Sequence, residues 1–128
     1  FKISNCYDVD KFYCAMCSTQ CSIQIGSDEI QGIMLCSHKP TTVTLVANAF
    51  EGMRNLKFLI VDNVHICEEL EYLPNGLRLL HLPNFHFPLP SNFCPQKLVT
   101  LEMPRSRIRL KKLFKQVWFS LKIMFKIF

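Results

Sequence analysis

The chain has 128 residues, of which 49% are hydrophobic and 20% are charged, so it is long enough for one domain with a modest core and is neither disordered nor fibrous. Its formal net charge of +5 arises at the C-terminal end, because eight of the 15 Lys and Arg residues lie at or after Arg105 and no Asp or Glu does. The part before Arg105 carries ten acidic and seven basic residues, which argues against a nucleic-acid-binding body.

Residues 1–25 form a Cys-rich leader that matches no structural pattern, and we expect them to be poorly ordered. Cys14 and Cys17 have the C-x2-C spacing of half a zinc site, with Cys6 and Cys21 as the nearest further thiols, but a second pair of this spacing is missing. We therefore expect no metal site, and a small zinc-binding protein is kept as an alternative interpretation. The chain shows no signal-peptide pattern and no run of about 20 uncharged apolar residues. We therefore expect a cytoplasmic protein whose seven cysteines are mostly free thiols.

Residues 26–55 are expected to form a strand–helix segment that precedes the rest of the fold. Residues 28–35, "DEIQGIML", and 41–46, "TTVTLV", are typical of two strands joined by a turn around His38–Pro40. Residues 47–53, "ANAFEGM", predict one or two helical turns with Phe50 and Met53 facing inward. This segment would cover one end of a repeat structure or form a degenerate repeat of it.

Residues 56–116 contain a pattern that recurs every 21 residues, beginning at Leu56, Leu77 and Leu98. Counting each start as position one, apolar residues occupy positions one, four, six and eleven: Leu56, Leu59, Val61 and Ile66; Leu77, Leu80, Leu82 and Phe87; Leu98, Leu101, Met103 and Ile108. A period of about 20 to 29 residues is that of leucine-rich repeats, in which each unit adds one short parallel strand. The sequence therefore predicts an α/β fold, a short leucine-rich-repeat solenoid of about three repeats. Three unrelated amphipathic strands in a small sheet are the alternative.

The segments between these strands are rich in Pro and Gly, as in "LPNG" (73–76) and "FPLPSNFCP" (87–95), which rules out long helices there. Position nine, where an asparagine is expected, holds Val64, Phe85 and Ser106 instead. Asn63 and Asn84 stand one place earlier. The repeats are therefore irregular.

The tail, residues 110–128, has the pattern of a basic amphipathic helix. Its apolar residues fall at helical spacing, whereas Lys111, Lys115, Lys122 and Lys126 gather on the opposite side. Three interpretations remain open: a helix that covers the open core, translated non-coding sequence, or a helix on an anionic membrane. The 21-residue pattern breaks at Lys122, so residues 117–128 are treated as a separate tail.

Three segments resemble the start of the leucine-rich-repeat region of plant TIR–NB–LRR disease-resistance receptors: "AFEGMRNLKFL" (49–59), "YLPNGLRLL" (72–80) and "LPSNFCPQKLVTLEMPRS" (89–106). The resemblance extends over residues 26–116, and it departs from the family where Leu82 replaces a frequent Trp. The family's TIR and nucleotide-binding domains and its G-x-x-x-x-G-K-[ST] loop are absent from this sequence. The resemblance therefore implies a fragment of an intracellular immune receptor that is not an enzyme and holds no cofactor.

Side chains at positions three, five and seven should point away from the core, because side chains alternate along a strand. Repeat proteins use this concave face for partners. The candidate protein-binding residues are Phe58, Ile60, Asp62, Leu79, His81, Thr100 and Glu102, together with Arg105. The resemblance implies a protein partner, either a pathogen effector or the receptor's own nucleotide-binding domain. It does not imply a nucleic-acid partner, and a membrane is not expected as the main partner. A membrane-surface module built on the tail is the alternative from another class.

Other reactive side chains are weaker candidates. His65, Glu68, Glu69 and Glu71 are close in sequence, but they fall between predicted strands, where solvated charge is expected. Cys67 and Cys94 have no histidine partner in register. We therefore predict no catalytic residue.

Overall fold

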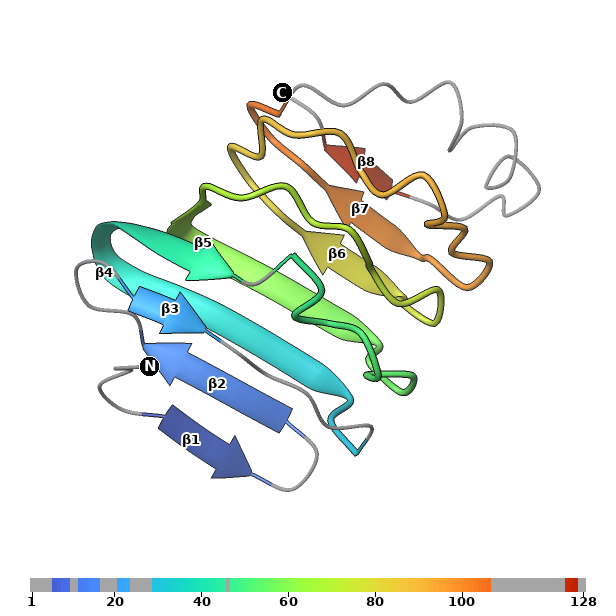
Figure 1. Cartoon of the computed structure of the whole chain (residues 1–128), viewed down its shortest axis with the longest axis horizontal. Coiled ribbons are helices and arrows are strands. Elements are labelled where there is room, and N and C mark those ends of the chain that lie inside the picture. The colour runs from blue at the N-terminus through green and yellow to red at the C-terminus, as the bar shows by residue number, and fades with distance from the viewer. Residues whose placement is uncertain are drawn as a thin grey trace.

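The computed structural model describes residues 29–45 and 47–106 with their side chains, and the backbone of four strands outside these ranges. The strands are β1 (Cys6–Val9), β2 (Phe12–Met16), β3 (Cys21–Ile23), β4 (Gly32–Leu45), β5 (Phe58–Ile66), β6 (Leu79–His81), β7 (Thr100–Glu102) and β8 (Met124–Lys126). They form one sheet in the order β1-β2-β4-β5-β6-β7-β8, with β3 paired to β4 beside this path (Figure 1).

Six strands, β2 and β4 to β8, run parallel to one another and build the solenoid (Figure 1). Their first residues are register partners in one row: Phe12, Gly32, Phe58, Leu79, Thr100 and Met124. Equivalent carbonyl oxygens accept hydrogen bonds from the next turn: Lys57 O from Arg78 N at 2.7 Å, and Arg78 O from Val99 N at 2.7 Å. The predicted solenoid of short parallel strands with a 21-residue repeat is confirmed.

The core includes positions one, four and six of the repeat, whereas at position eleven Ile66 is buried, Phe87 is partly buried and Ile108 lies outside the described residues. All nine residues at positions one, four and six are at most 1% exposed: Leu56, Leu59, Val61, Leu77, Leu80, Leu82, Leu98, Leu101 and Met103. Burying each such side chain contributes about 1.5–3 kcal/mol. A solenoid turn can bury them only against the neighbouring turns, so the repeats stabilise one another.

The segment before the repeats differs from its prediction. Residues 32–45 form the single strand β4, which Figure 1 shows bending back on itself near its middle. The chain changes direction where the turn is predicted, but the two halves pair separately with β5, and the register shifts between Cys36 and Thr41. Pro40, which has no N–H to donate, lies in this interruption.

Residues 47–52 form successive turns and not the predicted helix. Glu51 N bonds Asn48 O at 2.9 Å and Met53 N bonds Phe50 O at 3.2 Å, both spanning three residues, as in a tight turn. Gly52, with a φ of +86°, takes a left-handed conformation that ends any helical path. Phe50 and Met53 face inward as predicted, since both are 0% exposed.

Each repeat turns its corner through a residue with positive φ. Asn63, Asn84 and Arg105 stand at position eight of successive repeats, with φ values of 58°, 55° and 56°. Asparagine tolerates this conformation better than most residues, which explains why the asparagines lie one place before the expected position nine. In the first two repeats position nine points inward instead, because Val64 and Phe85 are 4% and 1% exposed, whereas Ser106 in the third repeat is half-buried.

Both ends of the chain contribute strands. Residues 1–25 contain a β1–β2 hairpin and β3, although no regular structure is predicted for them. β2 pairs with the first half of β4, and β3 pairs with the second half. The two short strands therefore run alongside the bent strand that comes after them in the sequence.

In the tail, Met124–Lys126 is the strand β8, paired with β7, so the helix prediction is wrong for these three residues. The rest of the predicted helix, including residues 110–123, lies outside the described residues. The strand forms because it continues the parallel pairing, 24 residues after β7 instead of 21. Across the segments that the structure describes, none forms a helix able to cross a bilayer.

Candidate functional site

The exposed face of β5, β6 and β7 is the candidate site. At positions three and five the side chains are only partly buried, whereas positions four and six between them are buried, as strand alternation requires. Strand pairing aligns these residues in two rows: Phe58, Leu79 and Thr100 in the first, and Ile60, His81 and Glu102 in the second. Six of the eight predicted site residues therefore lie together on one face.

The other two predicted residues lie toward its margin. Asp62 is exposed at the seventh position, near the shift in the β4–β5 pairing. Arg105 lies beyond the end of β7 on the corner turn, where its Nε donates to Asn84 Oδ1 at 2.9 Å. The Arg105 side chain is thus tied to the previous turn and is not part of either row.

One residue of this face was missed by sequence reasoning. Met34 in β4 is the register partner of Ile60 and is 40% exposed. The strand that contains Met34 is predicted as part of the segment before the repeats, residues 26–55. The sequence therefore does not place Met34 beside the exposed residues of the first repeat. The signal that could have found it is the alternation of buried Ile33 and Leu35 around it.

The centre of the face is polar. His81 Nδ1 and Glu102 Oε2 are 3.0 Å apart, and their side chains are 26% and 27% exposed. Directly opposed pairs of this kind contribute about 0.2–1 kcal/mol across neighbouring strands. The contact fixes the orientation of both side chains, and the backbone of Lys126 in β8 continues the same row.

The remainder of the face is apolar and acidic. Met34, Phe58, Ile60 and Leu79 adjoin one another across β4, β5 and β6. Within the described strands β4 to β7, positions three, five and seven hold Glu102 and Asp62 but neither Lys nor Arg. This combination suits a partner that presents apolar and cationic groups.

The weaker candidates Cys67, Glu68, Glu69 and Glu71 lie after the end of β5, outside both rows. Glu68, Glu69 and Glu71 are exposed, and no group of three or more potential metal ligands occurs among the residues with described side chains. Cys67 Sγ lies 3.7 Å from Val43 O and Thr44 Oγ1 in a half-buried position. The Cys6, Cys14 and Cys21 side chains and all of Cys17 lie outside the described residues.

Three curated proteins of Arabidopsis thaliana are similar to part of this chain. Disease resistance-like protein DSC1 is 36% identical over 97 residues, which cover 66% of this chain and 8% of that protein. Disease resistance protein RPS6 is 34% identical over 94 residues, 65% of this chain and 8% of its own length. Disease resistance protein RRS1 is 37% identical over 94 residues, 66% of this chain and 7% of its own length.

The chain therefore spans less than a tenth of the length of the curated relatives it matches. No protein-family profile matches it, and no solved structure does.

Proposed function

Because the chain is homologous to a segment of plant disease-resistance receptors of the TIR–NB–LRR class, as its motifs predict, we propose that its concave face recognises another protein in immune signalling. The observation that carries the proposal is the two aligned rows of half-exposed side chains on β5, β6 and β7. A rigid parallel ladder holds these side chains at fixed spacing, which reduces the ordering cost of binding.

The partner that we propose is either a pathogen effector or the receptor's own nucleotide-binding domain, bound in the cytoplasm without catalysis. The apolar group of Met34, Phe58, Ile60 and Leu79 would supply the desolvated contact area. Glu102, held by His81, would select a cationic group beside it. Binding energy should therefore concentrate at the boundary between Ile60 and His81.

The test begins with transcript sequencing across both ends of the coding segment, to find whether a nucleotide-binding domain is encoded upstream. That domain is then titrated against chains carrying Ile60→Asp or His81→Ala. We expect each change to weaken binding at least about tenfold, because central interface residues typically contribute more than 1 kcal/mol.

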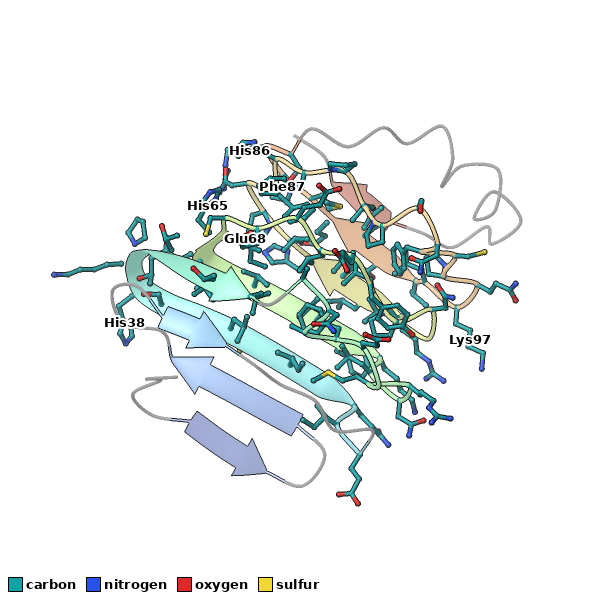
Figure 2. All side chains as sticks on the ribbon, in the orientation of Figure 1. His38, His65, Glu68, His86, Phe87 and Lys97 are labelled. Atoms are coloured by element: carbon teal, nitrogen blue, oxygen red, sulfur yellow. The ribbon has the colours of Figure 1, made fainter. Side chains whose placement is uncertain are left out.

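The matched control is Lys97→Ala, because Lys97 is exposed on a return segment outside both rows (Figure 2). It should bind like the unmodified chain. Equal loss in all three variants, or no loss in the two concave variants, would contradict the proposal. Absence of a nucleotide-binding domain from the transcript would count against the receptor context.

A further inference from the structure

Two histidines from successive turns of the solenoid lie side by side. His65, near the end of β5, and His86, after β6, both occupy position ten of their repeats. Their ring centroids are 5.8 Å apart, with the ring planes inclined by 53° (Figure 2). The 21-residue repeat brings them together, because equivalent positions of parallel turns are neighbours.

His65 is half-buried and His86 is exposed, and neither imidazole hydrogen-bonds to a side chain or backbone group within the described residues. Each neutral imidazole therefore offers a nitrogen lone pair.

The spacing suits one metal ion between the rings. Zinc–nitrogen bonds of about 2.0–2.1 Å at a tetrahedral angle put two ligating nitrogens about 3.4 Å apart. Rings with centroids 5.8 Å apart can meet this condition when the lone pair of one nitrogen from each ring points toward a shared position between them, because the nitrogens lie on the ring perimeters. The inclined ring planes allow the two lone pairs to converge.

We propose that His65 and His86 together bind one divalent transition-metal ion of the kind that imidazole favours, such as Zn²⁺ or Cu²⁺. No third protein ligand joins them among the described side chains, so water completes the coordination and the ion exchanges readily. The site lies outside the two rows of the concave face, and it does not involve the cysteines of the leader. A bound ion would link the first repeat to the second.

The experiment measures Zn²⁺ bound per chain by equilibrium dialysis under reducing conditions, using the full 128-residue chain on a soluble fusion partner that lacks histidine. The variants are His65→Gln, His86→Gln and the double substitution. The control is His38→Gln, since His38 is exposed but lies away from the pair (Figure 2). Zinc bound by cysteines is a background common to every variant.

We expect each single substitution to remove one equivalent of Zn²⁺, the double substitution to remove no more than either single one, and His38→Gln to remove none. Unchanged stoichiometry in the single variants would overturn the proposal. So would independent losses that add in the double variant, because separate histidines would then bind separate ions.

A second measurement needs no substitution and so does not depend on the variants folding. Substoichiometric Zn²⁺ should perturb the imidazole NMR signals of His65 and His86 together in the unmodified chain, and leave those of His38 in place. Perturbation of only one of the two rings, or of all histidines alike, would contradict a shared site.

Discussion

The corner residue of each repeat is a place where one backbone conformation decides which amino acids fit. Asn63, Asn84 and Arg105 share a φ between 55° and 58°. Asn84 N also bonds Pro104 O at 2.9 Å, so the corner is tied to the next turn. In the third repeat Ser106 Oγ takes part, accepting from Phe85 N at 3.0 Å and lying 3.3 Å from Leu82 O. Positions eight and nine of the repeat therefore supply both the positive-φ corner and hydrogen bonds between neighbouring turns.

A residue-scale prediction concerns Asn84. Asn84→Val should lower the free energy of unfolding by at least about 1–2 kcal/mol, because a β-branched residue is strained at this φ. Asn84→Gly should cost less, since glycine adopts positive φ freely. Denaturant unfolding of both variants measures the difference, and a valine variant as stable as the glycine variant would disprove the argument.

At the scale of elements, the prediction succeeds where a strand is specified by its own side chains. Leu80 is buried as predicted, because strand alternation fixes its side within each turn. The prediction of two strands in place of β4 reflects the interruption at Pro40, which is visible in the sequence. The sequence does not show that the segments on both sides of Pro40 pair with β5. β8 was missed because its pairing to β7 depends on the partner's backbone, and the apolar pattern breaks at Lys122.

In the candidate site, too, the sequence predicts which residues are neighbours but not how their side chains interact. The neighbours Ile60, His81 and Glu102 could be predicted, because the 21-residue register places equivalent positions together. The 3.0 Å contact between His81 and Glu102 could not, since it depends on side-chain conformations. The pairing of His65 with His86 follows from the repeat, because both residues occupy position ten of successive turns.

The element-scale prediction concerns the strand cores. Leu80→Ala should destabilise the chain by about 2–5 kcal/mol, because the side chain is 0% exposed and its loss leaves a cavity between three turns. Glu68→Ala, on an exposed return segment, should change stability by less than about 0.5 kcal/mol. Chemical unfolding of both variants on the same soluble fusion gives the comparison, and similar effects would show that Leu80 is not a core residue.

At the scale of the whole molecule, the described strands form one sheet whose order begins with β1 and ends with β8. Unpaired N–H and C=O groups on such edges are available to other chains. Repeat proteins also require terminal units that shield the core, and short solenoids are marginal when these are small. The interior turns are therefore better protected than the two ends.

At this scale we predict that the isolated chain self-associates. Light scattering with size-exclusion chromatography should show species larger than 14.9 kDa whose size grows with concentration. Fusion of further repeats beyond β8 should reduce this association, because it would pair the free edge. A monomeric chain with a cooperative thermal transition would contradict the prediction.

The row of paired residues also has an evolutionary consequence. Its members Phe12, Gly32, Phe58, Leu79, Thr100 and Met124 follow one another at intervals of 20, 26, 21, 21 and 24 residues, yet the strands remain in register. Insertions and deletions in the return segments are thus absorbed without shifting the strands. A lineage under pressure to change what it recognises could vary the exposed rows by substitution, while changes in length accumulate harmlessly on the opposite side.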